Sequence, residues 1–159
     1  MVDLTVNVAG VEMKNPVMLA SGTCGYGREL AELFPLEALG GIMVKGTTPQ
    51  PKPGNPVPRI LEGPAGVINS VGLQNPGVDQ VIEKELPWVT QQGLAVWVNI
   101  AGASPEDYGY MAQRLDQTPG IAGLEVNISC PNVKAGGLAF GVEKGTAAAV
   151  VREVRQKTI

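Results

Sequence analysis

The feature that most constrains this chain is a repeated alternation of short apolar runs with helical patterns. Four apolar runs predict strands, and each is followed by a segment that predicts a helix. The predicted strands span residues 17–20, 41–46, 95–100 and 121–129, and the predicted helices span 28–34, 77–91, 104–117 and 142–157. Such alternation is typical of a parallel sheet, either doubly wound or closed as a TIM barrel.

The segments between these units also carry clear signals. Residues 4–8 and 11–14 flank Ala9-Gly10 and predict a β-hairpin ahead of the first strand. The loop at residues 47–58 holds five prolines and must be extended, and we expect it either to cover a site or to meet a partner. Residues 59–61 and 66–68 predict a second hairpin. The run at residues 17–20 is wholly apolar, as in strands buried on both faces of a sheet.

The number of repeats narrows the fold class. Neither GxGxxG nor GxxxxGK[ST] follows the first predicted strand, so a Rossmann or P-loop interpretation loses its main support. A complete TIM barrel needs eight such units and about 250 residues. The 159 residues hold four units behind a hairpin, which predicts an α/β half-barrel of the TIM (β/α)8 class forming one domain over residues 1–159.

Charge and residue types exclude several classes of function. A net charge of −3 argues against nucleic acid or an anionic membrane as a partner. No apolar run approaches the roughly 20 residues that span a bilayer, and the N-terminus does not resemble a signal peptide, so we expect a cytoplasmic location. The chain has no histidine, which excludes Ser-His, Cys-His and His-metal sites, and no metal site is expected.

Polar side chains stand at the ends of the predicted strands. Lys45 ends the second strand, Asn99 lies near the end of the third and Asn127 near the end of the fourth. Desolvating such groups costs several kcal/mol unless partners are supplied. Barrel enzymes bind ligands at the carboxyl ends of their strands, so these residues together predict a site there. The alternative is that each amide binds the backbone of a neighbouring loop.

The two cysteines, Cys24 and Cys130, receive different interpretations. With no secretory signal, free thiols are expected rather than a disulfide. Cys130 follows the fourth strand and is flanked by Pro131 and Asn132, where a thiolate of lowered pKa is a plausible base. The alternative for a lone cysteine is a small buried hydrophobic residue, and we favour that alternative for Cys24.

Four motifs carry a resemblance to a known family. They are, in order, NPVMLASGTCGYG, VKGTTPQPKPGNPVPR, GVINSVGLQNPG and EVNISCPNVKAGG, and together they cover most of the chain. They resemble the N-terminal half of a dihydroorotate dehydrogenase. More narrowly, they are similar to the class 1B, NAD-linked type, in which an FMN-bearing barrel subunit pairs with an electron-transfer subunit that carries an iron–sulfur cluster and FAD.

The resemblance implies a reaction and roles for particular residues. Dihydroorotate would be oxidised to orotate in pyrimidine biosynthesis, with a hydride passing from C6 to FMN and a proton from C5 to Cys130. It implies a homodimer of the full-length barrel. The implied substrate-binding residues are Lys45, Asn69, Ser70, Val71, Gly72, Leu73, Asn127 and Asn132. The implied cofactor-binding residues are Ser21, Lys45, Gly46, Asn99 and Asn127. Glu125 is a candidate for a buried polar residue inside the barrel and receives no role.

The sequence departs from the family in one large respect. Nothing corresponds to the family's strands five to eight, which would bring the loops that grip a phosphate and a further lysine. The chain is therefore expected to be a piece of a longer protein, a half that pairs with another chain, or a non-catalytic half-barrel. A related flavin enzyme that acts on another dihydropyrimidine is a further alternative.

Overall fold

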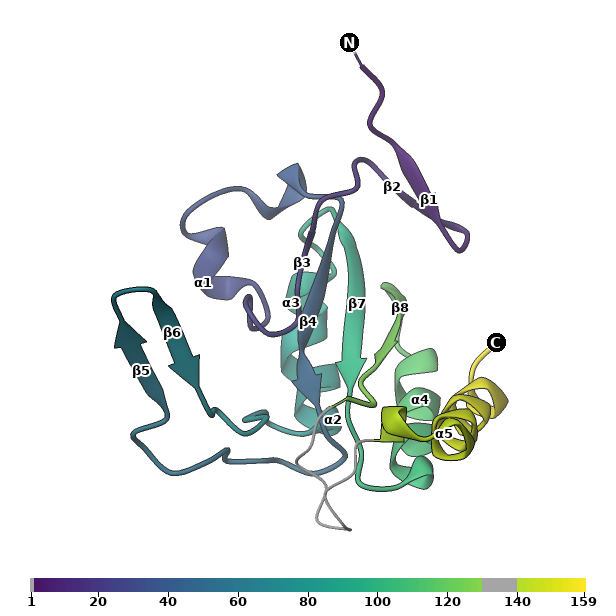
Figure 1. Ribbon diagram of the computed structural model, residues 1–159. Coiled ribbons are helices and arrows are strands. Elements are labelled where there is room, and N and C mark those ends of the chain that lie inside the picture. The colour runs from purple at the N-terminus through teal and green to yellow at the C-terminus, as the bar shows by residue number, and fades with distance from the viewer. Residues whose placement is uncertain (1, 130–139) are drawn as a thin grey trace.

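The centre of the molecule is a parallel four-stranded sheet (Figure 1). The structure is a computed structural model that describes residues 2–129 and 140–159. The strands are β3 (Met18–Leu19), β4 (Gly41–Thr47), β7 (Ala95–Ile100) and β8 (Ile121–Val126). They pair in the order β3-β4-β7-β8, the same as their order in the chain. A doubly wound sheet reverses direction at a switch point, whereas a barrel adds each strand beside the last, so this order is that of a barrel.

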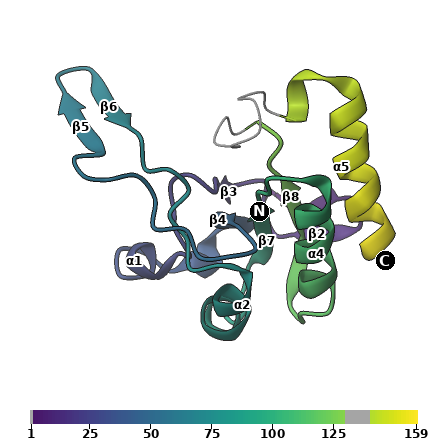
Figure 2. The same cartoon turned by 90° about the horizontal axis from the view of Figure 1, so that it is seen from below.

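Helices cover one face of the sheet and form an arc around it (Figure 2). Alternate residues of β4 and β7 point into this layer, and Ile42, Val44, Val96 and Val98 are all 0% exposed. They pack against helix residues such as Val81, Val89 and Met111 in one hydrophobic core. The helical elements are α1 (Arg28–Ala31), η1 (Leu36–Ala38), α2 (Val78–Gln80), η2 (Val81–Glu85), α3 (Leu86–Val89), α4 (Pro105–Asp116), η3 (Phe140–Val142) and α5 (Lys144–Lys157). The predicted fold class, four βα units of a partial α/β barrel, is confirmed.

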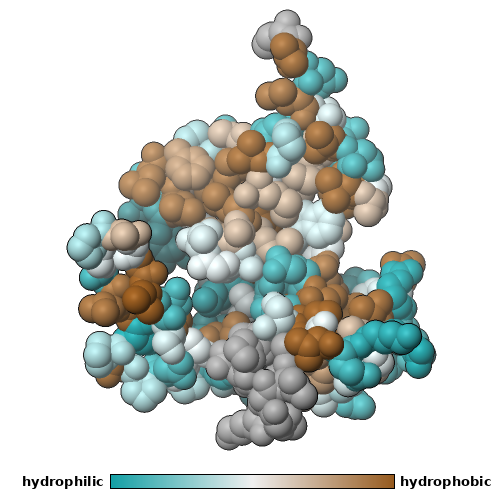
Figure 3. Space-filling view, in the orientation of Figure 1, coloured by the Kyte–Doolittle hydropathy of each residue, from teal (hydrophilic) through white to brown (hydrophobic). Residues whose placement is uncertain are grey.

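Both predicted hairpins are present. Strands β1 (Val6–Val8) and β2 (Val11–Met13) precede the sheet, and β5 (Ile60–Gly63) and β6 (Gly66–Asn69) follow the proline-rich loop. The β5–β6 hairpin projects from the body of the molecule, and hydrophobic side chains gather on it in the space-filling view (Figures 1 and 3). Ile68 is 73% exposed and Leu61 is 67% exposed, so this hairpin is apolar and lies outside the core of the described residues.

Two strand predictions need correction. The run at residues 17–20 was expected to be buried on both faces, but Val17 is 54% exposed and β3 is only two residues long. The reason is position, because β3 pairs only with β4 and forms an edge of the sheet among the described residues. The fourth strand was expected to reach residue 129, but β8 ends at Val126.

The predicted helix at 77–91 is interrupted by a wide turn. Helix α2 passes into the π-helical segment η2 before α3 begins, and Leu86 N donates to Val81 O, five residues back. Pro87 has no N–H, and its ring would crowd the carbonyl of Glu83 in a regular α-helix. The wider π turn accommodates the proline without ending the helix.

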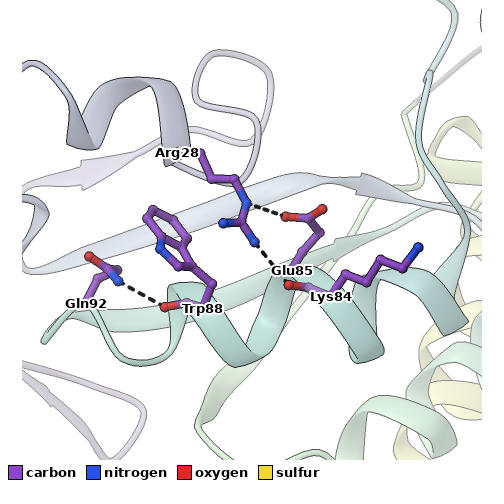
Figure 4. Close-up of polar contacts among 5 residues, drawn as sticks. All are labelled: Arg28, Lys84, Glu85, Trp88 and Gln92. Atoms are coloured by element: carbon purple, nitrogen blue, oxygen red, sulfur yellow. Dashed lines mark hydrogen bonds and ion pairs between the residues drawn. The ribbon is translucent and has the colours of Figure 1, made fainter.

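A polar contact joins α1 to this interrupted helix (Figure 4). Arg28 Nε lies 2.9 Å from Glu85 Oε2, and the guanidinium lies 4.6 Å from the centroid of the Trp88 ring. Arg28 also donates to Lys84 O at 3.1 Å. The guanidinium therefore combines an ion pair with a cation–π contact, a geometry that a lysine ammonium would not reproduce.

The last two helices begin with side-chain caps. Ser104 Oγ accepts from Asp107 N at 3.4 Å, as the Ser-Pro-Glu-Asp sequence predicts. Glu143 caps α5 by accepting from Gly145 N and Thr146 N at 3.3 and 3.2 Å. Within the described residues, no helix is both long and apolar enough to cross a membrane.

Candidate functional site

The face of the sheet opposite the helices carries polar side chains at its carboxyl end. Asn99 on β7 lies beside Glu125 on β8 in the strand register, and Asn127 follows directly after β8. Ser21 follows β3 at the same end of the sheet. Because the four strands are parallel, residues at their carboxyl ends meet along one edge.

These four residues form a connected hydrogen-bond network. Asn99 Nδ2 donates to Glu125 Oε1 at 2.6 Å and to Ser21 Oγ at 3.4 Å. Ser21 Oγ in turn donates to the same carboxylate oxygen at 3.3 Å. Asn127 Nδ2 lies 3.5 Å from Asn99 Oδ1. Asn99 is 1% exposed, and the network supplies the partners that a buried amide requires.

A β-bulge interrupts β4 beside this network. Val44 pairs with Val98 and Thr47 with Ile100, so β4 holds one more residue than β7 between these pairs. The extra residue lies at Lys45 or Gly46. A Cβ added to Gly46 would lie 2.9 Å from Asn99 Oδ1, which places this backbone directly against the amide. Bulges re-aim side chains beside active sites, and a glycine within a strand is their usual sequence signal.

The turn before α2 completes the edge of the site. Leu73 has a φ of 54°, a strained value for a residue with a branched side chain. Its Cδ2 atom would lie 3.2 Å from a Cβ on Gly46. Asn75 is buried and fastens this turn, since its Nδ2 donates to Leu73 O at 2.7 Å and its Oδ1 accepts from Thr48 N at 3.1 Å. The first residues of the proline-rich loop are thereby tied to the site.

A cavity of about 300 Å³ opens beside the network. Leu73 and Asn127 contribute to its wall, and so do residues 48–52 of the proline-rich loop. The other lining residues are Ala101, Gly102, Ala103, Asp107 and Tyr108. Of the two roles expected for the proline-rich loop, its position along this cavity favours covering the site.

The predicted site residues therefore fall into four groups. The structure brings Ser21, Gly46, Leu73, Asn99 and Asn127 together, and Lys45 directly precedes Gly46 on β4. Asn69 and Ser70 are exposed at the base of the β5–β6 hairpin, and the hydrogen bonds found for Ser70 run to Asn55 and Arg59. Val71 and Gly72, which connect that hairpin to Leu73 in the chain, are partly buried. Cys130 and Asn132 lie outside the described residues.

Cys24, which lies within the described residues, and the nearby Tyr26 have structural rather than catalytic roles. Cys24 is 4% exposed, and its Sγ contacts the carbonyl oxygens of Ala20 and Met43 at 3.3 and 3.2 Å. Burial raises the pKa of this thiol, so it stays protonated near neutral pH. Burial and the charge of Glu85 raise the pKa of Tyr26 to about 12.

Sequence reasoning missed two residues that the structure places in the site. Glu125 received no role, yet it accepts hydrogen bonds from both Asn99 and Ser21. The signal was its alternation with Asn127 on one face of the strand. Tyr108 on α4 donates its hydroxyl to Asn127 O at 2.7 Å and packs edge-on against Phe140, with ring centroids 5.8 Å apart. No local pattern pointed to this tyrosine, because the contact joins a helix to a distant strand end.

Comparison with known proteins places this arrangement in a family. The family model described as dihydroorotate dehydrogenase matches residues 3–158. This chain belongs to the dihydroorotate dehydrogenase family. The predicted resemblance is confirmed.

The similar proteins include named catalytic subunits. The chain is 52% identical to the dihydroorotate dehydrogenase B (NAD(+)) catalytic subunit of Geotalea uraniireducens, over 99% of this chain and 52% of that protein. It is 55% identical to the protein of the same name from Desulforudis audaxviator, over 99% of this chain and 51% of that protein. The chain thus spans about half the length of these relatives.

A solved structure supports the fold independently. The dihydroorotate dehydrogenase of Eimeria tenella, crystallised with ferulenol, superimposes with a TM-score of 0.76 at 24% sequence identity. The match covers 98% of this chain and 43% of that protein. At this identity the likeness speaks for the fold, which is that of part of a TIM barrel.

Proposed function

We propose that this chain supplies the flavin- and substrate-binding half of a dihydroorotate dehydrogenase, which oxidises dihydroorotate to orotate in pyrimidine biosynthesis. The observation that carries the proposal is the network of Ser21, Asn99, Glu125 and Asn127 at the carboxyl ends of the strands. It lies on the sheet face that the helices leave open, in a chain of this family. Ligands of barrel enzymes bind at this end of the sheet.

The chemistry of these groups suits FMN. The edge of a flavin ring alternates carbonyl oxygens with an N–H, and amides and a hydroxyl are the neutral groups that can donate to or accept from such an edge. Ser21, Asn99 and Asn127 supply such groups, and Lys45 adds a positive charge. Gly46 has no side chain, which leaves the backbone beside Asn99 open to close approach. When bound, FMN supplies the acceptor for the hydride that leaves C6 of the substrate.

The remaining roles belong to the chain's own residues. Lys45 binds the substrate carboxylate as a fixed cation next to the flavin. Residues 69–73 wrap the substrate, and Asn127 and Asn132 bind the edge of its pyrimidine ring. Cys130 is the base: its thiolate takes the proton from C5 as the C5–C6 double bond forms. The chain has no histidine to compete for this role.

The name of the relatives also suggests a partner subunit for this protein. They are called catalytic subunits of an NAD(+)-linked enzyme, which implies a second kind of subunit in their assemblies. We infer that this protein likewise pairs with an electron-transfer subunit bearing an iron–sulfur cluster and FAD, through which electrons reach NAD. We further propose a homodimer of the barrel subunit and a cytoplasmic location.

The visible absorption spectrum tests the proposal first. The protein as its gene encodes it should be yellow, and dihydroorotate added without oxygen should bleach the flavin bands. Dihydrouracil, which lacks the carboxylate, serves as the matched substrate control and should bleach them far more slowly. A protein that takes up no flavin on titration would indicate a non-catalytic half-barrel. Bleaching by dihydrouracil but not by dihydroorotate would indicate a different substrate.

The two cysteines provide a matched pair of variants. Cys130→Ala should abolish flavin reduction by dihydroorotate at neutral pH, because the base is removed. Cys24→Ala changes a buried thiol in the core and should leave the reduction rate close to that of the wild type. Unchanged reduction in the Cys130→Ala protein would remove this residue from the mechanism.

A further inference from the structure

We propose that Glu125 is a positioning residue that fixes the orientation of two site amides and thereby makes Asn127 present an N–H donor to the ligand. Hydrogen bonds among the described residues set this orientation. The identity of the ligand rests on the proposed function.

Glu125 determines which end of the Asn99 amide faces it. An ionised carboxylate accepts hydrogen bonds and donates none, so the Asn99 group that faces it must be the amide nitrogen. Nδ2 lies 2.6 Å from Glu125 Oε1 and 3.4 Å from Ser21 Oγ. The Ser21 hydroxyl hydrogen is directed to the same carboxylate at 3.3 Å. The three groups form a closed triangle in which each donor has an acceptor, and both N–H groups of Asn99 are used.

Asn99 passes this orientation on to Asn127. With Nδ2 held by Glu125, Asn99 turns its Oδ1 toward Asn127, whose Nδ2 donates to it at 3.5 Å. The other end of the Asn127 side chain is fixed independently. Its Oδ1 accepts from Ser129 N and from Ser129 Oγ, both at 3.3 Å. A flipped Asn127 amide would place two carbonyl oxygens against each other and set its N–H groups against the backbone N–H of Ser129, so that this contact is lost.

One hydrogen of the Asn127 amide nitrogen remains for a ligand. The amide nitrogen of Asn127 has two hydrogens, and Asn99 accepts one of them. Asn127 also lines the cavity beside the network. The side-chain group of Asn127 that stays available is therefore an N–H, so a ring carbonyl oxygen or a carboxylate fits it and a ring N–H does not. Glu125 therefore selects the acceptor edge of a ligand without touching it.

A set of stability measurements tests the orientation without any ligand. Asn127→Asp places a carboxylate oxygen against Asn99 Oδ1 and should lower the melting temperature by several degrees. Adding Glu125→Gln should restore much of this loss, because the glutamine can donate to Asn99 Oδ1 and let the Asn99 amide turn over. Adding Glu125→Met removes the same charge but offers no donor, so it should restore less. Equal restoration by the two changes, or none by either, would overturn the proposal.

A ligand titration measures the dissociation constant for orotate, which would not change if Glu125 had only a packing role. Glu125→Gln alone lets the Asn99 amide adopt either orientation, so the dissociation constant for orotate should rise about tenfold, the equivalent of about one hydrogen bond. An unchanged dissociation constant for orotate would also overturn the proposal. If the protein binds no flavin and no orotate, the proposed function fails, while the melting temperatures still decide the role of Glu125.

Discussion

The two faces of the four-stranded sheet are built from alternating residues of the same strands, yet their chemistry is opposite. On the face that meets the helices, Val44 and Val98 are paired neighbours and both are 0% exposed. One residue further along β7, Asn99 turns to the other face and joins Glu125. The comparison separates two tasks. The apolar face supplies burial, which dominates folding stability, and the polar face holds groups that a protein keeps for binding.

Substitutions on the two faces of the sheet should also differ in their energetic consequences. An apolar side chain that fills the core cannot be shortened without leaving a cavity. A satisfied polar network contributes little net stability, because folding exchanges hydrogen bonds with water for hydrogen bonds within the protein. Changes on the helix-covered face are therefore expected to alter unfolding, and changes on the open face to alter ligand binding.

The largest effect is expected in the core. Ile42→Ala should lower the free energy of unfolding by about 2–5 kcal/mol, because the residue is 0% exposed and the cavity cannot be refilled. Urea denaturation followed by circular dichroism measures this. Ile60→Ala on the β5 strand, where the side chain is 58% exposed, is the matched control and should change the value by about 0.5 kcal/mol or less. Similar losses in the two variants would contradict the division between core and hairpin.

Lys45 provides the corresponding test on the open face. Lys45→Met keeps the length of the side chain and removes its charge, so the rate of flavin reduction by dihydroorotate should fall roughly 10- to 100-fold, the equivalent of a hydrogen bond to a charged group. Stopped-flow absorbance measures the rate, and urea denaturation should show a stability close to that of the wild type. Lys84→Met, at an exposed position on η2, is the control and should leave both quantities unchanged. A large loss of stability in Lys45→Met with a normal rate of flavin reduction would show that Lys45 serves folding and not ligand binding.

Tyr108 connects the two faces and should give an intermediate result. Its ring is buried in the helix layer, and its hydroxyl donates to Asn127 O at 2.7 Å. Tyr108→Phe should therefore lower the free energy of unfolding by about 1 kcal/mol, the typical value of one hydrogen bond. Tyr110→Phe, at a position that is 42% exposed on the same helix, should have almost no effect. Equal stability of the two variants would show that the bond to Asn127 contributes nothing.

The last effect appears only at alkaline pH. Because the pKa of Tyr26 rises from 10.0 to about 12 on folding, the folded protein holds this proton more tightly than the unfolded chain. The resulting stability is complete below pH 10 and is lost as the pH rises toward 12. Tyr26→Phe should flatten the fall in unfolding free energy over this range, and Tyr110→Phe should not. An identical pH dependence in wild type and Tyr26→Phe would contradict the burial of this hydroxyl.

The parts of the fold that were predictable are those with local causes. The strands β4 and β7 follow from their apolar composition, and the start of α4 follows from Ser104 and the proline after it. The missed features depend on contacts distant in sequence. The exposure of β3 follows from its place at the sheet edge, and the π turn of η2 follows from how Pro87 is accommodated within a packed helix.

The same distinction holds for the site. Strand periodicity was enough to place Asn99 and Asn127 on one edge, because parallel strands end together. The role of Glu125 depends on the register that sets β8 beside β7, and the role of Gly46 depends on a bulge of one residue. Neither register nor bulge can be read from a single strand. The predictions for Cys130 and Asn132 fall outside the described residues and stay predictions.

The most direct test of the polar face as the site is a titration of the flavin-loaded protein with orotate, followed by the difference absorption spectrum. We expect a saturable change in the flavin bands for the wild type and for Lys84→Met, because orotate binds next to the ring. The Lys45→Met protein should show a much weaker change at the same concentrations, while the exposed hairpin variant Ile60→Ala should behave as the wild type. Identical titration curves in the wild-type and Lys45→Met proteins would contradict the assignment of ligand binding to this end of the sheet.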